Sequence, residues 1–456
     1  MGGMLRSFAE SKLSKTHREA ITVARALGIQ YVWIDALCVL QDNPADWEQE
    51  TKRMHRVFGN AALTIIAGRS AEAKLGFINS QLRQPARSCP IPMGTASYQG
   101  CLFAALPRTR KVGPVTLRRW CYQERLLSRR ILVFGEEQLF FQCRTGTQYE
   151  DGESVLHGPD GTLSPPMLGV FPPTTNVDAD PSERREWALR QWYEIVEQYT
   201  MRRLSNPHDI FAAIASIATL ANETLQQTFP RGLLWKPRYQ AEEGLFQPVA
   251  RPAPSRLAPS HPVNRAPSWS WAAVDGPVSQ IYDEGSSSLF RDTDWVKIRP
   301  QDPSGRWTSA DEWVARCNGV DKLHMPSCEL RMVGRLALAT TLPLEVQEHL
   351  PLGKARWVDW KHPYPPAALR ADAMLLVAED RATAPIPREL RVVVAIGVLD
   401  VGSEMHDGTV WCLQVIPDEG LMLRKMSNGS FCRIGWFLLE QPNWFDQCKE
   451  VNIRLA

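Results

Sequence analysis

Residues 31–68 read YVWIDALCVLQDNPADWEQETKRMHRVFGNAALTIIAG, and this stretch decides the fold. Its two ends, YVWI at 31–34 and ALTII at 62–66, are apolar runs rich in β-branched residues, a pattern typical of strands covered on both faces. Between them, Asp46 stands three residues before Gln49 and opens a helical pattern. We therefore predict that YVWI and ALTII are neighbouring parallel strands joined by a helix.

A second helix is predicted before this stretch, over SKTHREAITVARALG at 14–28. Thr16 and Glu19 have the spacing of a capping box, and Gly28 is a typical helix stop. The order helix, strand, helix, strand favours a mainly parallel α/β sheet. Ligands of such sheets bind beyond the carboxyl ends of the strands, which is where Asp35 falls.

Asp35 is therefore a candidate site residue, with two interpretations. Its carboxylate can accept hydrogen bonds from the ALCVLQ turn, or pair with an arginine, and so shape the loop. Alternatively, it belongs to a binding crevice. In either case we expect it to be mostly buried and partnered, because an unpaired carboxylate in this apolar context is costly.

A second candidate carboxylate lies in RWCYQERLLSRRILVFGEEQLFFQC at 119–143. Trp120, Glu124 and Leu127 fall on one stripe of a predicted helix, which directs Glu124 toward a core. ILVFG and QLFFQC then predict a hairpin. Glu124 either forms a buried ion pair or acts as a general acid/base whose pKa is tuned by burial. For the two carboxylates, the candidate ion-pair partners are Arg53, Arg119 and Arg125.

These two blocks, together with RAPSWSWAAVDGP at 265–277, resemble the signature blocks of the fungal heterokaryon incompatibility (HET) domain family. The resemblance implies an α/β domain distantly similar to TIR domains, in a fungal protein of nonself recognition and programmed cell death. WYEIVEQYTMRRLSNPHDIFAAIASIA and FPRGLLWKP resemble the region that follows the domain in long members. Typical members also carry a strand resembling SYCWG, and nothing like it stands before Lys15. We therefore expect an exposed sheet edge.

The predicted organisation has four parts: a HET-like α/β domain at 1–150, a loop or linker at 151–186, a helical segment at 187–245, and a PSWSW segment with a β-rich region at 246–456. The linker follows from the Pro, Gly, Asp and Thr content of 145–186. From about Glu329, apolar runs separated by turn residues predict a mostly antiparallel sheet. PSWSW predicts an extended strand with Trp269 and Trp271 on one side.

The tryptophans are either core anchors or the lining of an apolar ligand pocket. We name four of the sixteen as candidate substrate-binding residues: Trp33, Trp120, Trp269 and Trp271. Classical catalytic motifs are absent from the sequence, and the nine histidines show no metal-ligand spacing. We predict neither a metal site nor a cofactor.

Composition narrows the class of protein. The 456 residues carry 52 Lys and Arg against 50 Asp and Glu, a net charge of +2, so nucleic acid is not an expected partner. The sequence has neither a secretory leader nor a run of about 18 apolar residues, so no membrane span is expected. The ten cysteines form no CxxC pair. Scattered thiols of this kind indicate a soluble cytoplasmic or nuclear protein.

Three functions remain open. The resemblance implies a cell-death effector that acts through a protein partner. It also permits an enzyme of fungal secondary metabolism, a pericyclase such as a Diels–Alderase, that holds an apolar small molecule in a tryptophan-lined pocket. The third is a TIR-like NAD hydrolase with Glu124 and Asp35 as catalytic residues. The sequence does not specify an oligomeric state.

Overall fold

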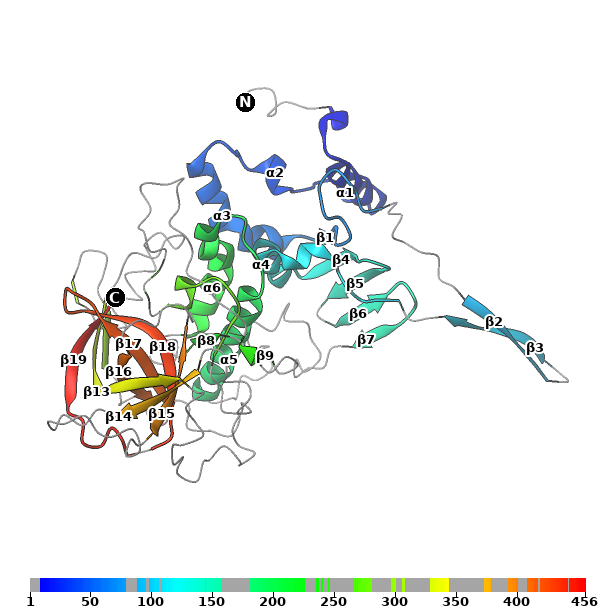
Figure 1. Cartoon of the computed structure of the whole chain (residues 1–456). Coiled ribbons are helices and arrows are strands. Elements are labelled where there is room, and N and C mark those ends of the chain that lie inside the picture. Colours follow the sequence, from blue (N-terminus) through cyan, green and yellow to red (C-terminus); the bar gives the residue numbers. More distant parts are fainter. Residues whose placement is uncertain are drawn as a thin grey trace. The chain divides into compact units, whose positions relative to one another are not determined.

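The computed structural model divides the chain into two compact units, one of residues 1–173 with 213–220 and one of 174–212 with 221–456 (Figure 1). The structure describes residues 9–78, 88–95, 98–105, 108–143, 145–156, 181–225, 235–237, 239–240, 245–246, 266, 268, 270–280, 297–300, 306–307, 329–343, 373–378, 393–400, 408–416, 419–441 and 443–456.

The first unit is built on a five-stranded sheet with the order β1-β4-β5-β6-β7. Its strands are β1 (Thr64–Ile66), β4 (Arg130–Phe134), β5 (Leu139–Cys143), β6 (Gly146–Tyr149) and β7 (Ser154–Leu156). β1 runs parallel to β4, with Ile65 opposite Leu132, and the remaining neighbours are antiparallel. The predicted α/β class and the 131–143 hairpin are confirmed. Two of the strands, β6 and β7, lie in the segment whose composition favours a loop.

Residues 31–34 do not form the predicted strand beside ALTII. They lead irregularly into a short helix, α2 (Asp35–Cys38), and Tyr31 stays 83% exposed. Trp33 is partly buried, with its ring edge-on to Phe58 at 5.7 Å between centroids. An apolar run becomes a strand only where a neighbouring strand takes up its N–H and C=O groups. β1 takes β4 as its partner and is the edge strand of this sheet.

The helices of the first unit begin earlier than the capping boxes predict. α1 (Lys15–Ala26) is capped by Ser14, whose side chain accepts from the His17 N–H, and it ends before Gly28, which has a φ of +69°. α3 (Pro44–Asn60) is capped by Asn43. The Thr16 and Glu19 side chains bind a distant loop instead: Thr16 Oγ1 accepts from the Gly76 N–H, and a Glu19 carboxylate oxygen accepts from the Ile78 N–H at 2.8 Å.

Four further elements belong to this unit. The 3-10 helix η2 (Pro114–Leu117) leads into α4 (Arg119–Leu127), which ends as predicted at Ser128. β2 (Ser88–Thr95) and β3 (Tyr98–Ala105) pair antiparallel in a separate two-stranded sheet.

Two helices occur in the predicted helical segment. α5 (Pro181–Thr200) lies in the second unit and buries Ile195, Val196 and Tyr199. α6 (Ala212–Leu225) follows the 3-10 helix η3 (Pro207–Ile210), and its residues 213–220 belong to the first unit. The PSWSW strand is wrong where it is described, because Trp271–Ala273 form the 3-10 helix η4, capped by the Ser270 side chain. Trp269 and most of 246–267 lie outside the described residues. Two small sheets pair β8 (Trp235–Pro237) with β11 (Val278–Gln280) and β9 (Tyr239–Gln240) with β10 (Leu245–Phe246).

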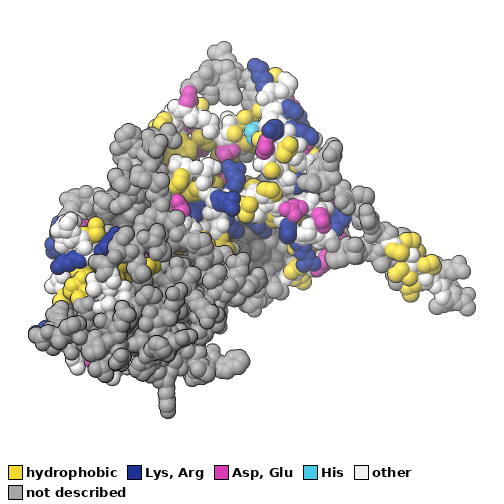
Figure 2. Space-filling view, in the orientation of Figure 1, with side chains coloured by type: hydrophobic (Ala, Val, Ile, Leu, Met, Phe, Trp, Pro, Cys, Tyr) yellow, Lys and Arg dark blue, Asp and Glu magenta, His cyan; other side chains and the backbone are white. Residues whose placement is uncertain are grey.

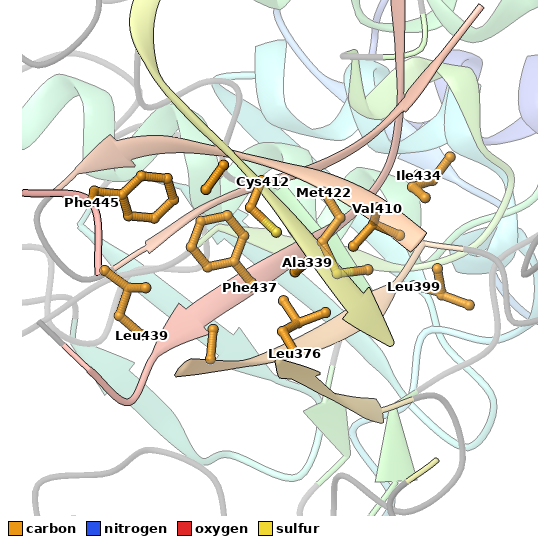
Figure 3. Packing of buried hydrophobic residues seen from close by; sticks show 12 residues of the cluster. Ala339, Leu376, Leu399, Val410, Cys412, Met422, Ile434, Phe437, Leu439 and Phe445 are labelled. Carbon is orange, nitrogen blue, oxygen red and sulfur yellow. The ribbon is translucent and has the colours of Figure 1, made fainter. Parts of the chain in front are cut away.

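An eight-stranded, mostly antiparallel sheet dominates the second unit, as predicted. Its strands are β12 (Lys297–Pro300), β13 (Leu330–Pro343), β14 (Ala373–Ala378), β15 (Val393–Leu399), β16 (Thr409–Ile416), β17 (Glu419–Lys425), β18 (Phe431–Leu439) and β19 (Glu450–Leu455). The sheet closes on itself, because the path β13-β14-β15-β18-β17-β16 returns to β13 with Leu336 opposite Leu413. Cys412, Met422 and Phe437 belong to one of its buried clusters (Figure 3).

Candidate functional site

The two carboxylates singled out by the sequence, Asp35 and Glu124, lie close together in the first unit. The negative charge of Asp35 is one of the causes that raise the pKa of Glu124. They come from separate elements, since Asp35 is the first residue of α2 and Glu124 lies in α4. The fold therefore joins residues that are far apart in the sequence into one acidic site.

Asp35 is held by the start of α2. Its Oδ1 accepts from the Ala36 N–H at 2.7 Å, and its backbone oxygen accepts from the Gln41 side chain at 3.2 Å. The end of this turn is tied to α3, because Asp46 Oδ2 accepts from the Leu40 N–H at 2.8 Å. The backbone partner is as expected, but the expected burial is wrong: Asp35 is exposed. Residues 31–34 form no strand, so nothing carries Asp35 into the sheet.

Glu124 is positioned through the last turn of α4. Ser128 Oγ donates to the Glu124 backbone oxygen at 2.7 Å and lies 2.7 Å from Thr64 Oγ1 at the start of β1. At the other end of the helix, Trp120 packs edge-on against Trp47 of α3, with 6.2 Å between ring centroids. The fully buried stripe of α4 is not the predicted one, and consists of Arg119, Tyr122, Gln123 and Leu126. Glu124 lies beside that stripe and is partly buried.

A buried polar network holds α4 in place. Gln123 is fully buried, and its Oε1 accepts from the Ser216 N–H at 3.0 Å. Ser216 Oγ in turn donates to the Thr51 backbone oxygen at 3.5 Å. This network joins α3, α4 and the 213–220 part of α6. It fixes the helix that carries Glu124 through buried groups, where solvent cannot compete for the hydrogen bonds.

The electrostatic environment makes Glu124 an unusual carboxyl group. Burial and then the negative charge of Asp35 raise its pKa from 4.5 to about 7, against the lowering effects of Arg118 and of a hydrogen bond from the Cys121 thiol. Near neutral pH the group therefore exists in both protonation states. This is the condition under which a carboxyl group transfers protons in either direction, as a general acid or base does.

Cys121, one helical turn before Glu124, is not a nucleophile in this site. Burial, followed by the charge of Glu124, raises the pKa of its thiol to about 12. The thiol stays protonated at neutral pH, and only a thiolate is strongly nucleophilic. Its contribution is to donate a hydrogen bond to Glu124.

Among the contacts between described residues, none joins the predicted arginine partners to the two carboxylates. Arg53 bonds Glu50 at 3.2 Å, Arg125 bonds Gln142 Oε1 at 3.1 Å, and Arg119 is buried in the stripe of α4. The positive charge near the site is Arg118, the exposed N-cap residue of α4. The i, i+3 spacing of Cys121 and Glu124 was visible in the sequence. The role of Arg118 was not, because it depends on where α2 lies.

The candidate tryptophans have aromatic neighbours in separate places. Trp33 packs on Phe58 and Trp120 on Trp47 in the first unit. Trp271 belongs to the second unit, where its ring lies 6.0 Å from that of Tyr199 and 6.4 Å from that of Phe211. A role of these rings in substrate binding stays a prediction.

Comparison with known families identifies the part of the chain that carries the site. Residues 4–124 match the family model described as heterokaryon incompatibility protein (HET). The chain carries a HET domain. The match contains Asp35, Arg118 and Cys121 and ends at Glu124, so the whole acidic site belongs to the HET domain. Comparisons with curated proteins and with solved structures gave no match.

The described residues contain no group of three or more His, Cys, Asp or Glu side chains that could hold a metal ion. Among the described helices, none is both long enough and apolar enough to cross a membrane.

Proposed function

We propose that this HET-domain protein is a cytoplasmic effector of fungal nonself recognition that triggers cell death. The observation that carries the proposal is the HET match over residues 4–124. The compact α/β unit with its internal polar network supports it, because an effector needs a stable domain that can be switched by a partner.

Inducible expression in a filamentous fungus tests this proposal. We expect the full chain to stop growth and reduce viability. Leu126→Asp is the matched control, because Leu126 is 3% exposed and a buried charge there prevents packing of the first unit. The effector role would be contradicted if growth stays normal while the wild-type protein accumulates to a level at which other proteins are tolerated.

A second function is favoured by one specific observation, the pKa of Glu124 at about 7 beside a second carboxylate. We propose that this pair supports cleavage of the N-glycosidic bond of NAD. The bond electrons leave with nicotinamide, water adds to the anomeric carbon of the ribose, and the Glu124 carboxylate takes the proton that the water loses. The charge of Asp35 stabilises the positive charge that develops on the ribose.

An NAD-consumption assay on purified full-length protein tests the second function. Glu124→Gln should lower turnover by about two to four orders of magnitude, since the amide cannot accept the proton. Asp42→Asn is the matched control, because Asp42 is an exposed carboxylate in the loop that follows α2. A wild type without NAD consumption, or a Glu124→Gln variant of full activity, rejects this function and leaves the effector proposal to stand on protein association.

The secondary-metabolism alternative rests on a shared tryptophan-lined pocket. Among the described residues, no contact groups the candidate tryptophans of the first unit around one space, since Trp33 and Trp120 have different ring partners. We therefore place this alternative behind the other two.

A further inference from the structure

The outer face of the closed sheet in the second unit carries two arginines directly opposite each other. Arg331 of β13 is paired in register with Arg454 of β19, and the row continues on β12 with Arg299. The adjacent residues Met332 and Ile453 belong to a buried cluster, so Arg331 and Arg454 extend to solvent on the other face. Figure 2 shows Lys and Arg side chains near the C-terminus that Figure 1 marks. Like charges directly opposite each other on neighbouring strands are destabilising, so this pair calls for an explanation.

The other end of the same two strands shows how the sheet neutralises an arginine. Arg335 of β13 stands opposite Glu450 of β19, and its Nη1 lies 3.5 Å from Asp446 Oδ1. Opposite charges at such positions stabilise a strand pair. The like-charged pair is therefore a departure from the pattern within one pair of strands, and Arg335 offers a matched control for it.

The contacts of the two arginines hold them in place without neutralising them. The guanidinium carbon of Arg331 lies 4.1 Å from the centroid of the Trp307 ring. Arg454 Nη2 donates to the Asn428 backbone oxygen at 2.8 Å, whereas Glu329 Oε2 is 3.6 Å from Arg454 Nη1, beyond hydrogen-bond distance. Among the described residues, no carboxylate lies within ion-pair distance of Arg331. Most of the N–H donors of both guanidinium groups are therefore available to an anion.

The geometry suits one anion that bridges both guanidinium groups. The Cβ atoms of directly opposite residues on neighbouring strands are about 5 Å apart, so the two side chains can converge on one group. A phosphate monoester has three acceptor oxygens and nearly two negative charges at neutral pH, which allows hydrogen bonds to both arginines at once. A carboxylate has two oxygens, and one guanidinium occupies both in a bidentate pair. The arginine pair therefore favours a phosphate over a carboxylate.

The surroundings of the pair limit the kind of phosphate. Glu450 and Asp446 are exposed near the other end of the strands, and they would repel a nucleic acid or an anionic membrane, whose charges extend over a wide surface. Small phosphorylated molecules usually bind in concave pockets, whereas this pair lies on the face of a sheet. We infer that Arg331 and Arg454 bind a phosphorylated serine or threonine of a partner protein. The inference concerns the second unit and does not rest on the proposed function.

Fluorescence anisotropy of the full chain with two labelled pools of short peptides tests the inference. Both pools have random flanking residues, and the central residue is phosphoserine in one and serine in the other. We expect the phosphoserine pool to bind at least about tenfold more tightly, and Arg331→Gln or Arg454→Gln to remove most of this preference, because each loses charge-assisted hydrogen bonds. Arg331→Lys keeps the charge but cannot form a bidentate pair, so it should also weaken binding. Arg335→Gln is the matched control and should leave the preference unchanged, since Asp446 and Glu450 already balance this arginine.

Thermal melting of each variant establishes that it is folded, and Arg331→Lys takes the place of a Gln variant that is not. The inference is overturned if the phosphoserine pool binds no better than the serine pool, or if its preference survives in both Gln variants. Tighter binding to phosphatidylserine vesicles or to duplex RNA than to the phosphoserine pool also overturns it, because the pair would then serve an extended polyanion. None of these results depends on cell killing or NAD consumption, so the proposed function is tested separately.

Discussion

Each unit of this protein places an acidic side chain in a protected environment, with opposite outcomes. In the first unit, Glu124 has Asp35 as its charged neighbour, and its pKa is raised to about 7. In the second, the fully buried Asp400 receives two hydrogen bonds from Arg433, from Nε at 2.8 Å and from Nη2 at 2.9 Å. Burial is the largest cause of the raised pKa of Glu124 and the charge of Asp35 adds to it, whereas the equally protected Asp400 has a guanidinium as its partner.

Arg433 is also satisfied on its other sides. Nη2 donates to the Trp235 backbone oxygen, and the guanidinium carbon lies 3.7 Å from the centroid of the Trp235 ring. The Arg433 N–H donates to Ser268 Oγ at 3.1 Å. The pair thus joins β18, β8 and the 268 turn in one buried network, whereas the acidic site of the HET domain remains open to solvent at Asp35.

The largest effect is expected from breaking the ion pair of Arg433 and Asp400. Arg433→Met leaves Asp400 buried without its counterion and should lower the free energy of unfolding by about 3–5 kcal/mol. Urea unfolding at neutral pH measures the change. Lys425→Met is the matched control, because Lys425 is exposed at the end of β17 and should change stability little. An Arg433→Met variant as stable as this control would contradict the importance of the pair.

A smaller effect, of opposite sign, is expected at Glu124. A carboxyl group whose pKa rises from 4.5 in the unfolded chain to about 7 in the fold binds more protons when folded, so its contribution to stability is lost as pH rises through this window. The loss of stability is at most about 3 kcal/mol, and solvent screening reduces it. Glu124→Gln should therefore become more stable relative to wild type between pH 4.5 and 7, in contrast to the loss expected for a buried ion pair.

Unfolding of the wild type and Glu124→Gln at several pH values measures this difference. The Asp42→Asn variant, with its exposed carboxylate, should follow the wild-type curve throughout. A Glu124→Gln variant that loses stability as pH rises would show that Glu124 is held as a charged group, like Asp400.

The smallest expected effects sharpen the comparison by changing only the neighbours of Glu124. Asp35→Asn removes a negative charge and should lower the pKa of Glu124, whereas Arg118→Gln removes a positive charge and should raise it. Each shift should be about one pKa unit or less, because both neighbours are exposed to solvent. Titration of the Glu124 carboxyl carbon by NMR measures both, and shifts in the same direction would contradict the assigned geometry.

Local patterns predicted the elements whose partners are close in sequence. The helix of 119–127 and the hairpin of β4 and β5 follow from helical spacing and a short turn, and most of the C-terminal strands follow from apolar runs between turn residues. The HET resemblance lies in these same blocks. Here local preference and the fold agree, so the sequence alone was sufficient.

The errors occurred where a distant partner decides the outcome. Residues 31–34 have strand composition but no strand beside them, and Thr16 and Glu19 have capping spacing but bind the loop that contains Gly76. The strand β19 was missed because its outward residues are exposed and only Ile453 and Leu455 are buried. Asp35 and Glu124 were both named, yet their proximity, which gives Glu124 its altered pKa, became visible only in the structure.

The closed sheet of the second unit has a consequence for how the chain folds. β13 cannot pair with β16, with Leu336 opposite Leu413, until β16 has been synthesised much later. Only then can the sheet close. Bringing together residues so distant in sequence costs chain entropy before the contacts stabilise the fold, and this slows folding. β1 and β4 of the first unit are also distant in sequence, with Ile65 opposite Leu132, but both are synthesised before the strands of the closed sheet. We expect the HET domain to gain its structure on the ribosome, and the closure of β13 on β16 to limit the folding rate of the whole protein.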